Sequence, residues 1–378
     1  MAEKPHSARA HRPAEVDAQP STAPDAVPDA AQDAAQDVVP DEVLVGYYRE
    51  MALVRAFELT AAEMYAKAKI GGYCHLNLGE EAAVVGLSHA LQTRDYLFTN
   101  YRDHGYAIGR GMEPKRVMAE LFGKSTGVSG GRGGSMHLFS TKLRMLGGYA
   151  IVGAQMPPAT GAALALSLRQ KPGPDAEVVM CLLGDGTTNI GAFHESLNLA
   201  GIWDLPIVYV IINNRLGMGT TVEMAAAEPE LYTRGCSYRI PGVRVDGDDV
   251  VAVRDAARTA LERARTERKP GLLEVMTFRL KGHSVVDPAR YRSAEDNEQA
   301  KEADPVPAFR ARLIGSGALD EAAALQIETD AAAIVSKAVA FADASPDSTP
   351  DQLFDFAYAT PVANAPHALP GDPLMEAS

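Results

Sequence analysis

The sequence is poor in cysteine, aromatic residues and positive charge. Its three cysteines, Cys74, Cys181 and Cys236, lack metal-ligand spacing, and their odd number argues against a set of disulfides. We therefore expect a reduced, intracellular protein. Acidic residues outnumber basic ones by 49 to 36, which gives a net charge of −13. Binding to nucleic acid, which needs a basic surface, is therefore not expected.

The chain also lacks a long apolar segment and a dinucleotide-binding motif. No run approaches the roughly 20 apolar residues of a membrane-spanning helix, so membrane insertion is not expected. The glycine runs at 130–134 and 217–219 do not match the G-x-G-x-x-G motif that follows a strand in nicotinamide-binding enzymes. A nicotinamide-dependent oxidoreductase is therefore disfavoured, although the pattern of strands and helices belongs to the α/β class.

The two ends of the chain differ in composition from the rest. Residues 1–40 are rich in Ala, Pro and Asp and are predicted to be disordered. They contain no apolar signal core and are too acidic for a mitochondrial transit peptide, so a bacterial cytoplasmic protein is expected. Residues 41–360 are predicted to form an α/β domain with C-terminal helices. Within it, residues 96–100 and 272–278 are predicted to be strands, and residues 101–111 and 281–300 are predicted to be loops. Residues 361–378 are predicted to form an extended tail.

Two short apolar runs predict neighbouring buried strands that end in polar residues. Residues 178–183 read VVMCLL and residues 207–212 read IVYVII, a composition typical of buried parallel strands. Apolar residues in 192–203 recur at helical spacing, so the segment predicts a βαβ unit with a right-handed crossover. The sequence GDG at 184–186 follows the first strand, and NN at 213–214 follows the second.

Asp185 and Asn214 are therefore expected at the carboxyl ends of adjacent parallel strands, the edge where open α/β sheets bind ligands. Carboxylate and amide oxygens suit Mg²⁺ that holds a diphosphate. The glycines beside Asp185 allow backbone N–H groups to approach phosphate oxygens. Each motif alone is more often a simple turn. Together, each after a buried strand, they predict a site for a metal-bound diphosphate.

The distance between these two motifs resembles the fingerprint of thiamine diphosphate-dependent enzymes. With YRDHG at 101–105, IVGAQ at 151–155 and GHSVVDP at 282–288, it makes residues 41–360 similar to the alpha subunits of the 2-oxo acid dehydrogenases. The resemblance implies a thiamine diphosphate-binding α/β fold, with a mainly parallel sheet flanked by helices and a helical C-terminal part. It also implies thiamine diphosphate and Mg²⁺ as cofactors.

The resemblance assigns the cofactor contacts to individual residues. The implied metal ligands are Asp185, Asn214 and the backbone oxygen of Leu216. The groups implied to bind the diphosphate belong to Tyr101, Arg102, Gly186 and Thr187. The main chain of Ala150 and Val152 is implied to hold the aminopyrimidine. Relatives usually have glycine where this chain has Ala150, and a positive φ angle there would cost about 1 kcal/mol.

Three histidines in loops are candidate catalytic residues by the same resemblance: His75, His104 and His283. An imidazole can donate a hydrogen bond to a developing enolate or carboxylate. His75 and His283 are expected near the thiazolium ring and the substrate, so His283 also counts as a cofactor contact. His104 either takes part or supports its loop. His89 and His194 are predicted to lie on helix surfaces without a catalytic role.

The resemblance further implies a reaction and its partners. The expected reaction is the oxidative decarboxylation of pyruvate, with acetyl transfer to a lipoyl group of a dihydrolipoyl acyltransferase. The family carries the glutamate that starts the aminopyrimidine proton relay on a separate beta subunit, and nothing in this chain resembles it. An α₂β₂ heterotetramer is therefore expected, with this chain inactive alone.

Other functions stay open. Acetoin dehydrogenase alpha subunits share the fingerprint, and NLAGIW at 198–203 resembles their sequence. Branched-chain 2-oxo acid dehydrogenase alpha subunits differ around residues 150–160. A non-catalytic scaffold subunit is disfavoured because Asp185 and Asn214 are both present. Ser284 resembles a phosphorylated serine of animal relatives, although an active-site loop without a kinase is the simpler interpretation.

Overall fold

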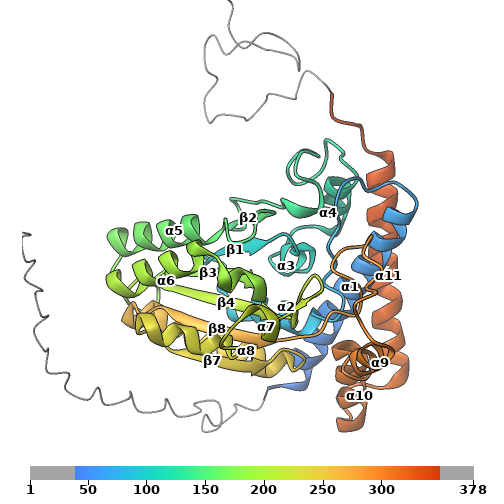
Figure 1. The fold of residues 1–378 in the computed structure, drawn as a ribbon. Helices are drawn as coiled ribbons and strands as arrows, with labels where there is room; N and C mark the ends of the chain where they lie inside the picture. The colour runs from blue at the N-terminus through green and yellow to red at the C-terminus, as the bar shows by residue number, and fades with distance from the viewer. Residues whose placement is uncertain (1–38, 350–378) are drawn as a thin grey trace, which may run out of the picture.

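The computed structural model describes residues 39–349 (Figure 1). The predictions for residues 1–38 and for the tail at 361–378 lie outside the described residues. Strands alternate with helices over most of the described chain, and the last two helices, α10 (Pro305–Ser316) and α11 (Glu321–Ala344), follow the sheet. The predicted α/β class with a helical C-terminal part is confirmed.

The main sheet has six strands, all parallel, in the order β2-β1-β3-β4-β8-β7. The strands span Tyr96–Asn100 (β1), Met145–Tyr149 (β2), Val179–Gly184 (β3), Ile207–Asn213 (β4), Gly242–Asp246 (β7) and Gly271–Met276 (β8). A small antiparallel hairpin follows β4 and consists of β5 (Leu216–Gly217) and β6 (Thr220–Thr221). The sequence predicted β1, β3, β4 and β8.

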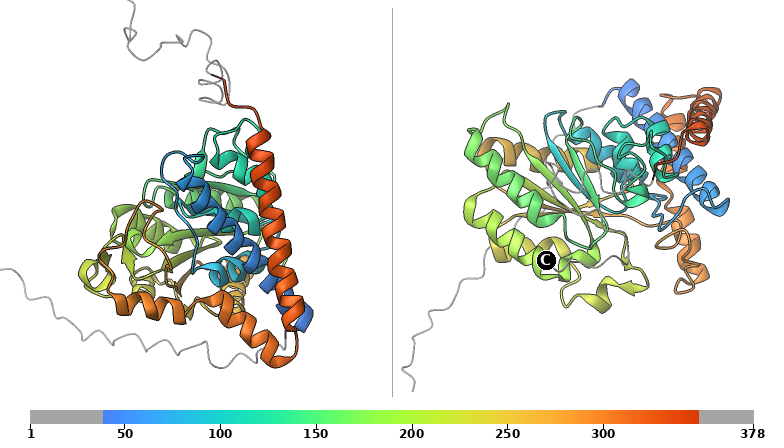
Figure 2. Two further views of the ribbon diagram at one scale, coloured as in Figure 1. Left: turned by 90° about the vertical axis from the view of Figure 1, so that its right-hand side faces the viewer. Right: turned by 90° about the horizontal axis from the view of Figure 1, so that it is seen from above.

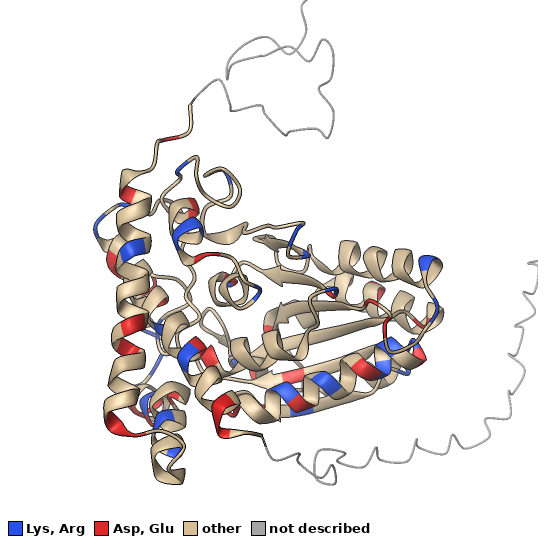
Figure 3. Cartoon of the chain, turned by 180° about the vertical axis from the view of Figure 1, so that it is seen from behind, with Lys and Arg blue, Asp and Glu red and all other residues tan. Residues whose placement is uncertain are grey.

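Helices cover both faces of this sheet (Figures 1 and 2). On one face lie α5 (Met156–Arg169) and α6 (Gly191–Trp203). The other face is packed by α1 (Asp41–Ala66), α2 (Glu81–Ala90) and α8 (Val250–Glu267), with α11 (Glu321–Ala344) running along α1. Charged residues of both signs are interspersed along α8 (Figure 3).

Alternate residues of the central strands enter two different cores. In β3, Met180 and Leu182 pack toward α2 and α8, whereas Cys181 and Leu183 pack toward α5 and α6. Both sides of each central strand are therefore apolar, which explains why the sequence shows uninterrupted apolar runs there rather than an alternating pattern. Within residues 39–349, no helix combines the length and the apolar character needed to cross a membrane.

Two segments predicted to be loops contain helices. The segment 101–111 forms α3 (His104–Gly109), and the segment 281–300 leads into α9 (Ala294–Glu302). Helix α3 has six residues, too few for a periodic signal, and its stability comes from the burial of four of them. The other helical segments are α4 (Pro114–Leu121), α7 (Val222–Ala225), α10 (Pro305–Ser316), η1 (Gly134–Met136), η2 (Asp185–Asn189) and η3 (Leu231–Tyr238).

A buried ion pair joins the start of β1 to α8. Arg265 donates from Nη1 and Nη2 to the carboxylate of Asp95 at 3.0 and 2.8 Å. The same carboxylate accepts from the backbone N–H groups of Gln92 and Val178 at 2.8 and 3.2 Å. Asp95 therefore ties together the chain segments that lead into β1 and β3, the two strands on which the site described below is built.

Asp95→Ala should strongly destabilise the fold, because it leaves the Arg265 guanidinium, 1% exposed, without its buried counter-charge. The other carboxylate near Arg265, that of Glu262, lies 3.5 Å away and is 57% exposed. Removing one partner of a buried pair costs about 3–5 kcal/mol. The matched control is Asp343→Ala, which breaks the exposed pair with Lys69 and should cost less than about 1 kcal/mol. Urea unfolding followed by circular dichroism measures both, and equal losses in the two variants would contradict the assignment.

Candidate active site

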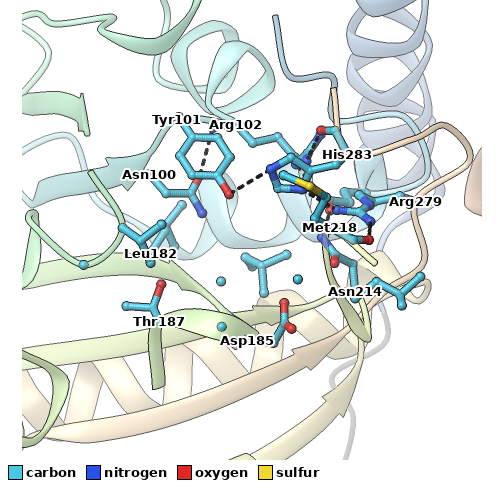
Figure 4. Close-up of a pocket in the computed structure, with 18 of the residues that line it drawn as sticks. Asn100, Tyr101, Arg102, Leu182, Asp185, Thr187, Asn214, Met218, Arg279 and His283 are labelled. Atoms are coloured by element: carbon cyan, nitrogen blue, oxygen red, sulfur yellow. Dashed lines mark hydrogen bonds and ion pairs between the residues drawn. The ribbon is translucent and has the colours of Figure 1, made fainter. Parts of the chain in front are cut away.

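The direction of the strand order reverses at β1, since β2 lies on one side of it and β3 on the other. Doubly wound sheets bind ligands in the crevice outside the carboxyl ends of the strands at such a point. A cavity of about 280 Å³ lies there. Figure 4 shows Tyr101 and Arg102, which follow β1, on one side of it, and Asp185 and Thr187, which follow β3, on the other.

The three candidate metal ligands, Asp185, Asn214 and Leu216, all line this cavity. Asp185 begins η2, Asn214 follows β4, and Leu216 begins the hairpin that turns back toward Asp185. A Cβ added at Gly217 in that hairpin would lie 3.9 Å from Asp185 Oδ2. The strand-end rule predicted that Asp185 and Asn214 lie at one edge of the sheet, and both line the cavity. Leu216, which the resemblance added to the set, lines it from the β5–β6 hairpin.

One atom of this set lacks a partner inside the protein. Asn214 Oδ1 is buried without a hydrogen bond, whereas Asn214 Nδ2 donates to Glu80 Oε1 at 2.9 Å. A buried acceptor without a donor is costly, and a cation beside it removes that cost. Within residues 39–349 no group of three His, Cys, Asp or Glu side chains could hold a metal. A cation here depends on amide and carbonyl oxygens beside one carboxylate.

The electrostatics of Asp185 also fit a cation. Burial raises the pKa of this carboxyl to about 6, although nearby backbone N–H groups and Arg279 act in the opposite direction. Burial likewise lowers the pKa of Arg279 to about 10, helped by the charge of Arg102. The protein thus holds a carboxylate where its charge is poorly solvated, a state that a bound divalent ion would stabilise.

The segment with the diphosphate candidates Gly186 and Thr187 closely approaches the segment predicted to hold the aminopyrimidine. Gly186 and Thr187 line the cavity from η2, and Val152 and Gly153 line it from the opposite segment. Gly153 has a φ angle of +80°, and a Cβ there would overlap Ile190 Cδ1, so only glycine fits. Ala150 is not among the lining residues, and its φ angle is not positive. Alanine therefore causes no backbone strain at position 150.

Arg102 lines the cavity and joins two of its loops. Its Nη1 donates to the Leu76 carbonyl at 2.6 Å, and its Nη2 donates to the His283 carbonyl at 2.8 Å. The side chain is 6% exposed. Arg102 therefore holds the segment that carries His75 against the segment that carries His283, in addition to placing positive charge at the cavity.

Three aromatic side chains form a cluster beside the cavity. The ring of His75 lies 4.4 Å from that of Tyr101 and 5.2 Å from that of His283, between ring centroids. Tyr101 and His283 line the cavity, whereas His75 contacts both of these rings without lining it. Burial and the charge of Arg102 lower the pKa of His75 to about 3. His75 is therefore neutral at physiological pH.

The tautomer of His283 is fixed by its neighbours. Arg279 Nη1 lies 3.0 Å from His283 Nδ1, and a guanidinium can only donate, so Nδ1 accepts and the proton sits on Nε2. His283 Nε2 lies 3.4 Å from the hydroxyl of Tyr101 (Figure 4). Burial, Arg102 and Arg279 lower the pKa of His283 to about 4. The side chain thus presents a neutral N–H donor.

His104 does not line the cavity. It is fully buried, with Nδ1 2.9 Å from Glu58 Oε2 and Nε2 2.8 Å from Ser135 Oγ. These contacts join α3 to α1 and to η1. His89 and His194 are exposed on α2 and α6, as the sequence predicted.

The cavity also contains residues that sequence reasoning did not select, chiefly Glu80, Asn100, Tyr106, Met218 and Arg279. Arg279 directly follows the strand predicted at 272–278, so the strand-end rule could have found it. Glu80 precedes α2 and Tyr106 lies inside α3. Neither position carries a local signal, because both reach the cavity only through the packing of helices.

Comparison with known proteins identifies the family. Residues 49–351 match the family described as "Dehydrogenase E1 component". The chain belongs to this family. Membership implies thiamine diphosphate as the cofactor, in agreement with the prediction from the sequence.

Several relatives are named as E1 alpha subunits. The protein named pyruvate dehydrogenase E1 component subunit alpha of Rhizobium meliloti (strain 1021) is 44% identical over 308 residues, covering 81% of this chain and 87% of that protein. The protein of that name in Zymomonas mobilis is 41% identical over 315 residues, covering 83% and 88%. The chloroplastic subunit alpha-3 of Oryza sativa is 41% identical over 319 residues, covering 83% and 75%.

Proposed function

We propose that this member of the E1 family is the alpha subunit of an acetyl-transferring pyruvate dehydrogenase. It takes part in the oxidative decarboxylation of pyruvate and in the transfer of the acetyl group to a lipoyl group. The observation that carries the proposal is the cavity at the β1–β3 reversal, where Asp185 lies beside an unpartnered Asn214 oxygen. The names of relatives at 41–44% identity support pyruvate as the substrate.

Different residues of the cavity would bind different parts of the cofactor. Asp185, Asn214 Oδ1 and the carbonyl of Leu216 would hold Mg²⁺. The backbone N–H groups of Gly186 and Thr187 at the start of η2 would donate to the diphosphate. Thiamine diphosphate, when bound, supplies the nucleophile and the electron sink for decarboxylation.

Arg102 and Tyr101 add charge and a hydroxyl donor on the β1 side. The main chain of Ala150 and Val152 would hold the aminopyrimidine, and of these two residues Val152 lines the cavity.

The histidines act on the substrate side. The neutral His283 would donate its Nε2 hydrogen to negative charge that develops on the substrate. His75 packs against His283 and Tyr101 and would limit the orientations of both rings. We assign His104 to holding α3 and the segment that carries Tyr101 and Arg102, because its contacts are internal.

The cavity lacks a carboxylate to serve the aminopyrimidine. Its lining contains two carboxylates, Asp185 and Glu80. Asp185 is assigned to the metal, and Glu80 already accepts from two asparagine side chains. This supports the proposal that a second chain, the beta subunit, supplies the base.

The exposed residues at the edge of the cavity are consistent with a partner subunit. Val152 and Met218 line the cavity and are exposed, as is the neighbouring Ile151. Exposed apolar side chains around a site are typical of a protein interface. We propose an α₂β₂ heterotetramer that delivers acetyl groups to a lipoyl-bearing dihydrolipoyl acyltransferase. Bacterial relatives favour a cytoplasmic location.

The test is reconstitution with the beta subunit and an artificial electron acceptor. The assembly should turn over pyruvate with a higher kcat/KM than acetoin or 3-methyl-2-oxobutanoate, and this chain alone should be inactive. A higher kcat/KM for acetoin or for 3-methyl-2-oxobutanoate would contradict pyruvate as the substrate and identify that compound as the substrate instead. Activity of the isolated chain would contradict the assignment of the base to a partner.

A further inference from the structure

Glu80 is a buried carboxylate, and each of its two oxygens accepts a hydrogen bond from the side-chain amide of an asparagine. Its Oε1 accepts from Asn214 Nδ2 at 2.9 Å, and its Oε2 accepts from Asn77 Nδ2 at 3.1 Å. Glu80 is 1% exposed and lines the cavity. Arg102 Nε lies 4.0 Å from Oε1 and supplies opposite charge. Glu80 thus links Asn214, which lies far along the chain, to Asn77, which precedes Glu80 by three residues.

This arrangement determines which end of the Asn214 amide faces the cavity. A carboxylate has only acceptors, so the NH₂ group of Asn214 must point to Glu80 and the Oδ1 atom must point away from it. That Oδ1 atom is the buried acceptor without a partner. The amide of Asn77 is fixed in the same way, because its Oδ1 accepts from Gly105 N at 3.1 Å.

We propose that Glu80 is a positioning residue that keeps the oxygen of Asn214 toward the metal, and that this role requires a carboxylate. The inference rests on the proposed function, in which Asn214 is a metal ligand. A glutamine at position 80 offers one acceptor and one donor to two NH₂ groups. Since Gly105 holds Asn77 in place, the Asn214 amide would turn and present its NH₂ group to the cation.

The chain contains a matched control one residue away. Asn213 Nδ2 donates to Glu274 Oε1 at 2.6 Å, and both residues are buried. Asn213 Oδ1 accepts from Arg215 N at 2.9 Å, and neither Asn213 nor Glu274 lines the cavity. Glu274→Gln therefore disturbs the same kind of buried pair without touching the candidate metal ligands.

The experiment measures Mg²⁺ affinity by titration calorimetry, on the assembly with the beta subunit and saturating thiamine diphosphate. Glu80→Gln should weaken Mg²⁺ binding by about 10–100-fold, the usual effect of removing a group that orients a metal ligand. Glu274→Gln should leave the affinity unchanged. Melting temperatures of all variants separate loss of the site from loss of the fold.

A compensating pair makes the test specific. When Glu80→Gln is combined with Asn77→Asp, the new amide at position 80 can accept from Asn214 and donate to the new carboxylate at position 77. That carboxylate still accepts from Gly105 N, and the total charge equals that of the natural chain. Mg²⁺ affinity should return to the natural value, and this variant carries the test if Glu80→Gln alone does not fold.

Three results would overturn the inference: natural affinity in Glu80→Gln, an equal loss in Glu274→Gln, or no recovery in the double variant. Absence of Mg²⁺-dependent cofactor binding in the natural assembly would instead contradict the proposed function, so the two failures are distinguishable.

Discussion

Replacing Asp185 by Ala should abolish Mg²⁺-dependent binding of thiamine diphosphate while leaving the fold intact. Asp185 is the charged member of the candidate ligand set, and the other two members offer neutral oxygens. In the variant, the cation would be bound only by the Asn214 amide oxygen, the Leu216 carbonyl and the diphosphate, and no protein ligand would carry negative charge. Calorimetric titration of the assembly with cofactor and Mg²⁺ measures the effect, and unchanged affinity would contradict the metal assignment.

The fold should tolerate this change because the carboxylate does not stabilise the metal-free chain. Its pKa of about 6 lies above the usual 3.8, so the folded chain binds this proton more tightly than the unfolded chain does. The contribution of Asp185 to stability therefore falls as the pH rises from about 4 to about 6. Asp185→Ala removes the ionisable group, and with it this decrease in stability. Its melting temperature near neutral pH should not fall below that of the natural chain.

The same pKa predicts how cofactor binding depends on pH. Below about pH 6 a proton competes with Mg²⁺ for the Asp185 carboxylate, so the apparent affinity should weaken as the pH falls. Asp185→Asn, which keeps the shape of the side chain but not its charge, should bind weakly at every pH. A natural assembly whose Mg²⁺ affinity is constant between pH 5 and pH 7 would contradict this view of the site.

The strands predicted most clearly from the sequence, β3 and β4, are buried on both faces of the sheet. β3 and β4 lie in the middle of the sheet, and every residue of β4 is buried, so their apolar runs are unmistakable. β2 and β7 were missed because they lie at the two edges. β7 is only partly buried, and β2 contains two glycines. Edge strands have less contact with the cores, so their sequences carry a weaker signal.

The same reasoning explains which site residues could be predicted. Asp185 and Asn214 follow strongly marked strands, and the edge of the sheet brings them together. Glu80 could not be found this way, because its role depends on a contact with Asn214, 134 positions along the chain. His104 was placed among the candidates by its neighbours in sequence, yet α3 turns its side chain into the interior. Local motifs identify a segment but not the direction of each side chain.

His283→Ala should lower turnover by about 10²–10³, the usual cost of removing one preorganised donor at a site of developing charge. The matched controls are His89→Ala and His194→Ala. These side chains also have polar partners, at 2.9 Å from Glu50 and 2.7 Å from Tyr238, but they lie on exposed helix surfaces. Steady-state kinetics with saturating cofactor and the beta subunit present should show near-natural turnover for both controls.

A glutamine at position 283 tests whether the imidazole acts as a neutral donor. Its oxygen can accept from Arg279 as Nδ1 does, and its NH₂ group can replace the Nε2 hydrogen. His283→Gln should therefore retain more turnover than His283→Ala.

Because the pKa of His283 is lowered to about 4, protonation of this residue should not affect turnover between pH 6 and pH 8. Two results together would show that His283 transfers a proton instead. Turnover would fall equally in His283→Gln and His283→Ala, and the natural enzyme would show a pH-dependent change in turnover near pH 6.5 that is absent in both variants.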